Sequence, residues 1–432
     1  MAIRLSAADA DFEALFSDLL AQKREVSEDV DQAVAAILDD VRKRGDAAVT
    51  NYSRRFDRID LEKVGMRVTA EEIAAARAEC DPKTLDALKL ARDRIEAHHA
   101  KQKPADETYL DPIGVELGSR WTPLDSVGLY VPGGTAAYPS SVLMNAVPAK
   151  VAGVKRLAMV VPAPDGKLSP LVLAAAELAG VDEVFRIGGA QAVGALAYGT
   201  ETIAPVAKIV GPGNAYVAAA KRRVFGTVGI DMIAGPSEVL VVADGSANAD
   251  WVAADLLAQA EHDASAQSIL ITDDAELADA VERSVESQLK TLPREAIAGA
   301  SWRDHGAVIV VAAIDDAVPL ANRIAAEHLE IIAEDGDRLS REIRHAGAIF
   351  LGGHTPEAIG DYVGGSNHVL PTARTARFAS GLGVLDFVKR TSILRCGPEQ
   401  LRLIGPAAIR LGEAEGLAAH ARSVAIRMNA GA

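Results

Sequence analysis

The sequence predicts an α/β protein made of two tandem, Rossmann-like, doubly wound domains, with a helical N-terminal region and a helical C-terminal tail. Two observations support this fold class. From about residue 124 onward, short apolar runs alternate with alanine-rich helical patterns, as in βα units that build a parallel sheet. Only 4% of the 432 residues are aromatic, so we expect a core of Ala, Val, Leu and Ile, which is typical of buried parallel strands.

The apolar runs form two series, which predict two sheets that divide near the segment GPSE at 235–238. The first series comprises 127–131, 157–161, 184–187 and 208–210, and the second comprises 239–242, 268–272, 308–311, 329–332 and 348–351. Ligands of open doubly wound sheets bind outside the carboxyl ends of the strands. We therefore expect a site at the carboxyl edge of each sheet.

Helical patterns dominate both ends of the chain. Up to about residue 105, Thr69 with Glu72 fits a capping box, and Asp81 followed by Pro82 fits a helix start. His98 and His99 lie in a charged helical segment, and we expect both on a solvated face. A tail without strand character is expected from about residue 383.

Composition excludes several classes of protein. Lys and Arg number 45 against 60 Asp and Glu, a net charge of −15, which makes the chain a poor general nucleic-acid binder. The two cysteines, Cys80 and Cys396, form no CxxC pair, which argues against a thiolate zinc site and a disulfide scaffold. The N-terminus lacks a signal-peptide pattern, and no apolar run approaches the about 18 residues of a membrane span. We expect a soluble, cytoplasmic protein with no membrane partner.

Four glycine-rich loops stand out, at 131–141, 187–199, 210–216 and 233–238. The first three follow a predicted strand and lead into a helix, which presents backbone N–H groups and a positive helix end to a phosphate. The loop GPGNAY at 211–216 has the first two glycines of a GxGxxG motif, but Tyr216 replaces the third. For any one loop, a tight βα turn is an equal alternative. Together the loops favour a nucleotide site.

Two residue pairs suggest metal binding and acid/base catalysis. Gln259 and His262 are three residues apart on a predicted helix, so they share a face and resemble a metal half-site, although surface polarity is the alternative. Glu327 and His328 lie at a helix-to-strand junction, where they suit acid/base catalysis or simply end a surface helix.

Two further pairs are less specific. Asp361 and His368 share a glycine-rich segment, a type of loop that often carries function. Glu415 and His420 lie in the helical tail and are unremarkable alone. The residues by themselves therefore predict a nucleotide-dependent α/β enzyme with a His/carboxylate metal site.

A series of long motifs resembles the histidinol dehydrogenase family, in order and over essentially the whole chain. The motifs lie at 128–154, 188–200, 208–217, 231–241, 255–262, 325–331, 360–372, 376–390 and 414–429. The resemblance implies oxidation of L-histidinol to L-histidine through L-histidinaldehyde, with two NAD⁺ and one water, in the last steps of histidine biosynthesis.

The resemblance also implies site residues. One zinc ion per subunit would be bound by Gln259, His262, Asp361 and His420. Substrate would contact these ligands together with Ser237, His328, His368 and Glu415, and the catalytic pair would be Glu327 and His328. NAD would contact Tyr130, Gln191 and Asn214.

In this reading His328 is a neutral base with a pKa of about 6.5, and Glu327 activates the water that hydrates the aldehyde. The metal serves chiefly to orient substrate, and chelation by the substrate would retain the aldehyde between the two oxidations.

The expected organisation follows the family. We expect an N-terminal helical segment over 1–22, a first α/β domain with the metal and catalytic residues over 23–125 and 237–382, and a second with the NAD loops over 126–236. The tail, 383–432, would cross to the partner of a homodimer, so that Glu415 and His420 act in the neighbouring site.

Two other functions compete with this interpretation. A zinc hydrolase would use Glu327 or His328 to activate water, with the glycine-rich loops acting only as turns. A two-lobed ligand-binding protein would use the cleft between the α/β lobes without catalysis. NAD-dependent turnover separates both from a dehydrogenase.

Overall fold

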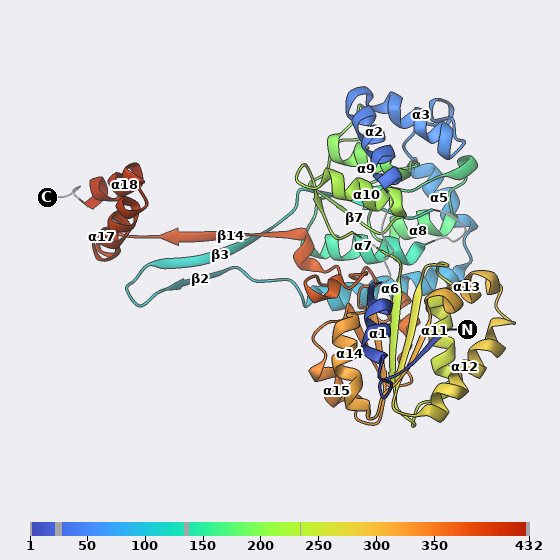
Figure 1. The fold of residues 1–432 in the computed structure, drawn as a ribbon. Coiled ribbons are helices and arrows are strands. Elements are labelled where there is room, and N and C mark those ends of the chain that lie inside the picture. Colours follow the sequence, from blue (N-terminus) through green and yellow to red (C-terminus); the bar gives the residue numbers. More distant parts are fainter. Residues whose placement is uncertain (1, 22–27, 134–137, 234, 429–432) are drawn as a thin grey trace.

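The computed structural model describes residues 2–21, 28–133, 138–233 and 235–428. Two α/β lobes lie one above the other, and a long arm extends from the region where they meet (Figure 1). The expected boundary at 22/23 lies outside the described residues, as do 134–137 and 234 within two of the glycine-rich loops.

The larger lobe contains a six-stranded parallel sheet in the order β1-β11-β10-β9-β12-β13. Its strands are β1 (Ile3–Ser6), β9 (Glu238–Ala243), β10 (Gln267–Thr272), β11 (Ala307–Val310), β12 (His328–Ile332) and β13 (Ala348–Leu351). Its helices are α1 (Phe12–Ala21), α11 (Ala249–Ala260), α12 (Ala275–Leu289), α13 (Glu295–His305), α14 (Ala317–Ile324), α15 (Gly336–Glu342) and α16 (Glu357–Tyr362). The five strands predicted for the second series are confirmed. Strand β1 was not predicted, because four residues at the sheet edge carry too short a pattern.

The smaller lobe contains a five-stranded parallel sheet in the order β6-β5-β4-β7-β8. Its strands are β4 (Ser126–Tyr130), β5 (Arg156–Val160), β6 (Glu183–Phe185), β7 (Lys208–Val210) and β8 (Gly229–Ile230). Helices α7 (Pro139–Ala152), α8 (Pro170–Leu178), α9 (Gly189–Tyr198) and α10 (Ala215–Val224) connect them. Counted along the chain, β4–β8 and β9–β13 both have the order 3-2-1-4-5, so the doubly wound prediction is confirmed for both lobes.

The helices that precede the smaller sheet pack on that sheet's lobe. They are α2 (Glu28–Arg44), α3 (Asp46–Phe56), α4 (Leu61–Val64), α5 (Ala70–Glu79) and α6 (Pro82–Ala100). Helix α2 shares a core with α9, and a Cβ at Gly194 would lie only 3.1 Å from Leu38 and 3.3 Å from Val41. This differs from the expected grouping of 23–125 with 237–382, because periodicity shows that a helix has an apolar face but not which sheet receives it.

The expected helix starts in this region are confirmed. Thr69 and Glu72 form a capping box, and the side chain of Asp81 caps α6. His99, however, is buried rather than solvated, with Nδ1 2.8 Å from the backbone oxygen of Ile95. It faces the core because it continues the apolar face of α6 that includes Ile95.

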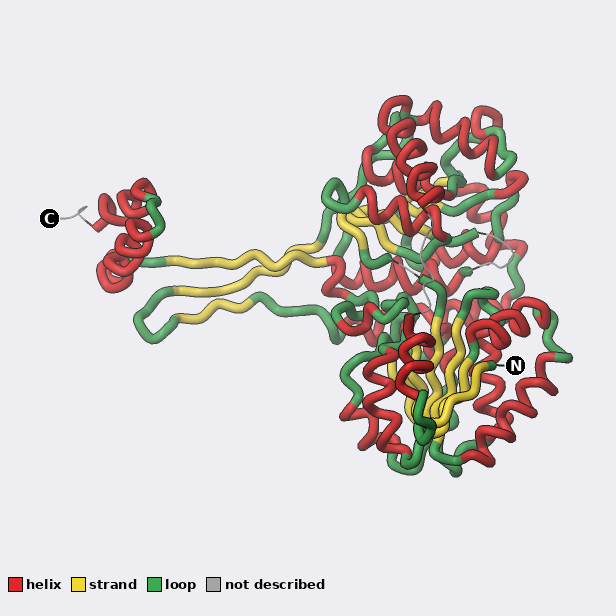
Figure 2. The backbone as a smooth tube through the Cα atoms, in the orientation of Figure 1, coloured by secondary structure: helices red, strands yellow, loops and turns green. Residues whose placement is uncertain are grey.

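An antiparallel, three-stranded sheet forms the arm, in the order β14-β3-β2 (Figure 2). Strands β2 (Glu107–Leu110) and β3 (Glu116–Pro123) precede the smaller sheet, and β14 (Val388–Arg395) follows the larger one. The expectation of a tail without strands is therefore wrong. Every residue of β14 is at least partly exposed, so the strand lacks the alternation that would identify it. Helices α17 (Pro398–Ala414) and α18 (Ala418–Met428) lie at the tip of the arm.

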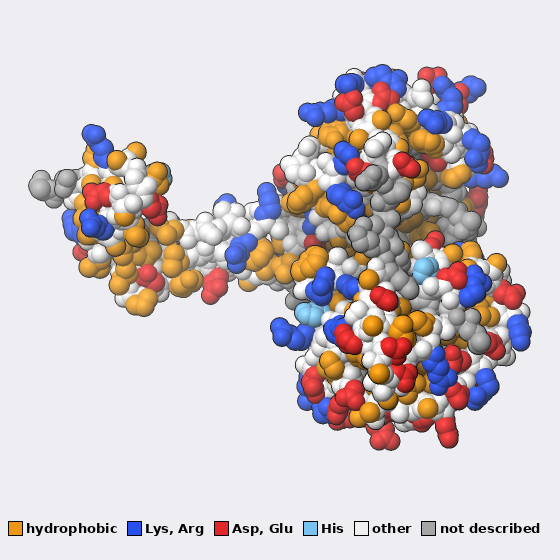
Figure 3. Space-filling view, viewed as in Figure 1, with side chains coloured by type: hydrophobic (Ala, Val, Ile, Leu, Met, Phe, Trp, Pro, Cys, Tyr) orange, Lys and Arg blue, Asp and Glu red, His pale blue; other side chains and the backbone are white. Residues whose placement is uncertain are grey.

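Charged side chains are spread over both lobes, whereas hydrophobic ones gather along the arm and its tip (Figure 3). The exposed apolar residues of the arm include Tyr109, Leu110, Leu394, Leu403 and Leu411. Within the described part of the chain, no helix combines the length and apolar character that crossing a membrane requires.

Candidate active site

The expected catalytic pair lies at the amino edge of the six-stranded sheet. Glu327 immediately precedes β12 and His328 is its first residue, while Glu238 begins the neighbouring strand β9. Strands β9 and β12 flank the point where the strand order reverses. The site therefore lies at the expected point along the sheet, where the strand order reverses. It lies at the amino ends of the strands, however, and not at the carboxyl ends as expected.

Two helices explain why the amino edge is the functional one. Helices α11 and α16 follow strands β9 and β13, so their C-terminal ends return toward the start of the sheet. Gln259 lies in the last turn of α11, His262 follows that helix, and Asp361 lies in the last turn of α16. Helix C-termini carry partial negative charge, which favours a cation at this edge.

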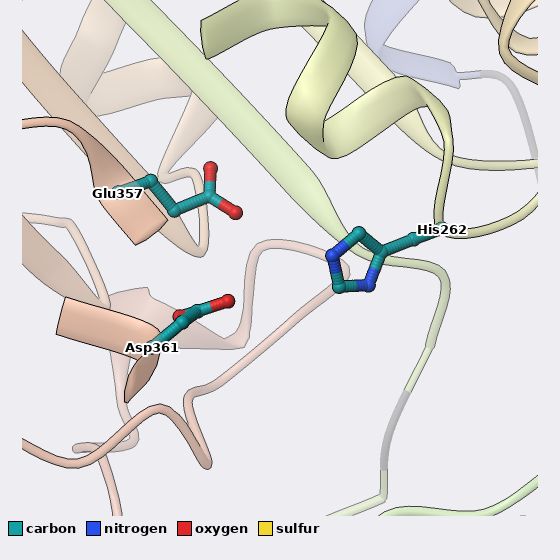
Figure 4. A group of neighbouring side chains, drawn as sticks. All are labelled: His262, Glu357 and Asp361. Atoms are coloured by element: carbon teal, nitrogen blue, oxygen red, sulfur yellow. The ribbon is translucent and has the colours of Figure 1, made fainter. Parts of the chain in front are cut away.

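His262, Glu357 and Asp361 form a group that could hold a metal ion. Their potential ligand atoms all lie within 4.8 Å of one another, and Figure 4 shows the side chains converging from the ends of α11 and α16. Glu357 is buried, Asp361 is partly buried and His262 is exposed at the mouth of the group. Desolvation by the surrounding protein nevertheless lowers the pKa of His262, which favours the neutral imidazole that a metal needs.

Several buried polar atoms at this group have no hydrogen-bond partner among the described residues. They are both amide atoms of Gln259, Oε2 of Glu357, Oδ1 of Asp361 and Nε2 of His328. Buried polar atoms normally have partners, and nitrogen and oxygen donors without thiolate suit zinc or another divalent ion. The residues present therefore fit a metal. Glu357 was missed from the sequence, although its spacing of four from Asp361 places the two on one helix face, as the spacing of three does for Gln259 and His262.

His328 is fixed in one tautomer by its backbone contact. Its Nδ1 lies 3.1 Å from the carbonyl oxygen of Glu238, which can only accept a hydrogen bond, so Nδ1 carries a hydrogen. Nε2 is thus the nitrogen that exchanges a proton, and it lies 3.6 Å from Oδ1 of Asp361.

Carboxylates surround the His328 ring and change its proton affinity. Burial opposes the charged imidazole, but Glu357, Glu327 and Asp361 together raise the pKa of His328 well above its usual value. Glu357 Oε1 and Glu327 Oε2 lie 3.8 and 3.9 Å from Nδ1. This corrects the expectation of a neutral histidine with an ordinary pKa, because sequence alone does not reveal buried carboxylates.

Glu327 is itself buried and can exchange a proton near neutrality. Burial raises the pKa of Glu327 to about 7, partly offset by His328 and by the N–H of Glu238, which donates to Glu327 Oε2 at 3.0 Å. A carboxyl group with such a pKa can act as acid or base at the operating pH of most enzymes.

Two further expected residues reach the same edge. Ser237 directly precedes β9, and its backbone oxygen accepts a hydrogen bond from the N–H of Gln267 at 3.0 Å. His368 lies in the loop after α16, close enough to Asp361 that each shifts the pKa of the other. The structure therefore brings together seven of the expected site residues: Ser237, Gln259, His262, Glu327, His328, Asp361 and His368.

Glu415 and His420 do not join this group within the chain. Glu415 ends α17 and His420 lies in α18, and both are exposed at the tip of the arm, away from both lobes (Figure 1). Their expected role in a partner's site stays a prediction.

Loops at the carboxyl edge of the five-stranded sheet bring two expected cofactor residues together. Tyr130 ends β4, and its hydroxyl accepts the N–H of Gly189 at 2.9 Å, at the start of α9. Burial raises the pKa of Tyr130 to about 12, so the phenol stays protonated. Gln191 is 1% exposed, its Oε1 has no partner among the described residues, and a Cβ at Gly189 would lie 2.7 Å from that atom.

The third expected cofactor residue, Asn214, is the N-cap residue of α10. Its Oδ1 accepts the N–H groups of Tyr216 and Val217 at 3.1 and 3.2 Å, which caps α10. Those two N–H groups are therefore engaged by Asn214 itself, and a contact of this loop with NAD stays a prediction.

A buried ion pair forms hydrogen bonds to the backbone of Gly211, the first glycine of the same loop. Lys221 donates to the oxygen of Gly211, and Asp231 accepts its N–H, both at 2.8 Å. Lys221 and Asp231 are paired with each other, with side chains 2% and 1% exposed. Gly211 has φ +110°, and a Cβ there would collide with the backbone of Tyr130. The loop is thus held against the end of β4.

The functional edges of the two lobes face each other. Asn367, beyond α16, donates to the backbone oxygen of Met144 in α7 at 2.7 Å. Tyr138, at the start of α7, is near enough to Tyr362 of α16 to contribute to raising the pKa of Tyr362, after burial and Asp361. Helix α7, which follows the first glycine-rich loop, therefore lies against α16 and the segment after it, which carry part of the histidine–carboxylate cluster.

This combination defines a two-lobed α/β enzyme with doubly wound sheets and a buried histidine–carboxylate centre between them. Comparison with known proteins places it more closely: the family model for histidinol dehydrogenase matches residues 20–428. The chain belongs to the histidinol dehydrogenase family, whose members are oxidoreductases of histidine biosynthesis.

Relatives and a solved structure agree with that assignment. The chain is 71% identical over 431 residues to histidinol dehydrogenase of Rhizobium meliloti, covering 100% of this chain and 99% of the relative. It is 70% identical over 429 residues to that of Bradyrhizobium diazoefficiens, covering 99% and 100%. The crystal structure of histidinol dehydrogenase from Elizabethkingia anophelis matches with a TM-score of 0.94 at 36% identity, over 99% of this chain and 98% of that one.

Proposed function

We propose that this protein is a zinc- and NAD-dependent histidinol dehydrogenase that converts L-histidinol to L-histidine through L-histidinaldehyde, using two NAD⁺ and one water. It would work in the cytoplasm, in the last steps of histidine biosynthesis. The observation that carries the proposal is the convergence of His262 and Asp361 beside His328, in a chain of this family.

The metal-binding residues we propose are Gln259, His262 and Asp361, with His420 of a second subunit completing the set. The free amide atoms of Gln259 and the free Oδ1 of Asp361 support this choice. Zinc would supply Lewis acidity and an anchor for the imidazole and amino nitrogens of the substrate. Ser237, His368 and the partner's Glu415 would contact the substrate around it.

His328 is the base that we propose for both oxidations. Its Nδ1 is committed to the Glu238 carbonyl, so Nε2 takes the hydroxyl proton as hydride leaves the adjacent carbon for NAD⁺. Asp361 is one of the three carboxylates that raise the pKa of His328, and its contribution would fall with a cation bound to it, which would favour the neutral imidazole that accepts the proton.

Glu327 is the group we propose for hydration of the aldehyde. Its pKa of about 7 lets the carboxylate take a proton from water as the oxygen adds to the carbonyl carbon, while the carbonyl oxygen takes the proton that Nε2 of His328 gained in the first oxidation, which leaves the imidazole neutral again. The resulting hydrate loses a second hydride to a second NAD⁺, while Nε2 of His328 takes the proton from its hydroxyl.

The arrangement of the lobes suits two successive cofactor bindings. Substrate is held at the edge of the larger sheet, whereas Tyr130, Gln191 and Asn214, the NAD residues that we propose, belong to the smaller one. NADH can therefore leave without disturbing the residues that hold the aldehyde.

A homodimer fits the arm. Apolar side chains such as Leu403 and Leu411 are exposed at its tip, and burying them against a second subunit would be favourable. The same contact would deliver Glu415 and His420 to the neighbouring site.

The test is NADH formation by the purified protein supplied with L-histidinol and NAD⁺, scored against histidine produced. We expect two NADH per histidine, loss of turnover on chelation and recovery with zinc. Turnover that survives chelation would remove zinc from the proposal. Hydrolysis without NADH would favour the zinc hydrolase, and tight binding without turnover would favour a binding protein.

A further inference from the structure

A buried carboxyl group that the proposed chemistry does not use lies beneath the site. Glu330 is 1% exposed and lies on β12, two residues after His328, so the two side chains leave the strand on the same face. Its Oε1 accepts the backbone N–H of Glu357, the first residue of α16, at 2.7 Å.

This hydrogen bond replaces a cap that α16 does not have. The N-cap position of α16 is Pro356, which makes no side-chain cap hydrogen bond. The helix has only six residues, and so short a helix is not stable without external contacts. A carboxyl oxygen at its first N–H group satisfies an orphan donor of this short helix.

Glu330 also reaches the second ligand-bearing helix. The carboxyl group of Asp255 on α11 lies close enough to that of Glu330 that each shifts the pKa of the other. Asp255 is four residues before Gln259, so the two lie on one face of α11. One side chain therefore connects α11, α16 and the strand that carries His328.

We propose that Glu330 is a positioning residue that holds α16 in register with α11, so that Asp361 and Glu357 meet His262. The inference rests on the proposed function only in taking zinc as the ion. Glu330 touches neither the ion nor the substrate in this role; it acts through the first turn of α16.

The test compares Glu330→Ala with Glu330→Gln in the full-length protein. Zinc affinity is measured by competition with a chromogenic chelator, and amide hydrogen exchange is followed at 357–362 in metal-free protein. We expect Glu330→Ala to weaken zinc binding by about 10- to 100-fold, the usual effect of losing a group that orients a ligand. It should also speed exchange in α16.

Glu330→Gln is the matched rescue variant. Its amide oxygen can still accept the N–H of Glu357 and its amide nitrogen can donate to Asp255, so we expect zinc affinity within about threefold of wild type. Ser284→Ala is the control for general destabilisation. It removes a hydrogen bond of 2.6 Å to Asp250, which lies in the first turn of α11 at the end opposite Gln259, and should lower the melting temperature without changing zinc affinity.

Each outcome decides a different question. Wild-type zinc affinity and unchanged α16 exchange in Glu330→Ala would overturn the proposal, as would a loss of more than tenfold in Glu330→Gln. Glu330→Gln preserves volume and polarity, so it remains informative if Glu330→Ala does not fold. If wild type itself binds no zinc, the metal assignment fails, while the exchange measurement still tests the positioning role.

Discussion

The two sheets have the same strand order but present opposite edges to the region between the lobes. The five-stranded sheet offers glycine-rich loops at the carboxyl ends of β4, β6 and β7. The six-stranded sheet offers Glu238, Glu327 and His328 at the amino ends of β9 and β12. Strand order locates the point where a ligand can bind, but the side chains at strand starts and helix ends decide which edge is used.

The two edges therefore suit different tasks. The amino edge of the larger sheet is lined by titratable groups and by the C-terminal ends of α11 and α16, which suits a cation and proton transfer. The carboxyl edge of the smaller sheet has backbone turns, neutral side chains such as Tyr130 and Gln191, and the buried Lys221–Asp231 pair, whose charges offset each other. Damage to one edge should therefore leave binding at the other edge intact.

The largest effect is expected from His262→Ala, which removes a proposed metal ligand at the amino edge of the larger sheet. Removing a metal ligand should lower zinc content and abolish turnover together, while NAD⁺ binding measured by titration stays within about twofold. Folding is checked by circular dichroism. Full zinc occupancy in this variant would remove His262 from the ligand set.

Glu327→Gln tests the same edge and distinguishes the first oxidation from the second. General acid–base groups contribute about 10²–10⁴-fold, and we expect a loss of that order in oxidation of histidinaldehyde, with a smaller loss in oxidation of histidinol. Single-turnover NADH formation with each substrate measures the two steps. Equal losses in both would contradict a role confined to hydration.

Lys221→Met tests the carboxyl edge of the smaller sheet. It leaves Asp231 buried without its partner, so we expect a loss of about 3–5 kcal/mol in the free energy of unfolding. The double variant Lys221→Met/Asp231→Leu should regain most of that stability, since it removes both charges. It should still bind NAD⁺ more weakly, because nothing then holds Gly211.

Denaturant unfolding and NAD⁺ titration measure these two quantities, and zinc content serves as the control. If the double variant bound NAD⁺ as tightly as wild type, the pair would stabilise the lobe without shaping the cofactor edge.

The smallest effect is expected outside both edges, at Glu72. The hydrogen bond from Arg186, opposed by partial burial, holds the pKa of Glu72 below its usual value of 4.5. A carboxyl group with a lowered folded-state pKa stabilises the protein above its unfolded pKa, and loses that contribution as pH falls through the folded value. Glu72→Gln should therefore cost about 1 kcal/mol or less at pH 7, since the carboxyl group is partly exposed.

Urea unfolding of both proteins at pH 7 and below pH 4 provides the measurement. The difference should disappear at the lower pH, with activity unchanged throughout. If the difference in free energy of unfolding persisted at the lower pH, it would arise from altered packing or hydrogen bonding of the side chain and not from its charge.

The sequence predicted the fold best where strands are buried on both faces. Runs such as Val239 to Val242 and Leu157 to Val161 are apolar throughout, and all nine predicted strands are present. Five strands were missed: β1, β2 and β8 have at most four residues, and no residue of β2, β3 or β14 is fully buried. Short or solvated strands owe their conformation to distant partners, which local pattern does not reveal.

The candidate site was predictable where spacing along one element carried the signal. Gln259 with His262 and Glu327 with His328 are local pairs, and both reach the same edge. Glu330 and Glu238 were missed because their roles depend on hydrogen bonds across the sheet and between elements. The raised pKa of His328 was missed for the same reason, since two of its three carboxylate neighbours, Glu357 and Asp361, come from α16, a separate segment of the chain.

The pairing of β1 with β11 has a consequence for how the chain is made. Ile3–Ser6 joins the sheet only beside Ala307–Val310, about 300 residues later. At synthesis rates of about 5–20 residues per second, the ribosome needs roughly 15 to 60 seconds to supply that partner. Residues 28–230, the whole of the smaller lobe, emerge within this interval and can fold. Strand β1 thus stays unpaired while most of the chain is made, and a nascent chain arrested before residue 307 should hold a folded smaller sheet behind an unpaired β1.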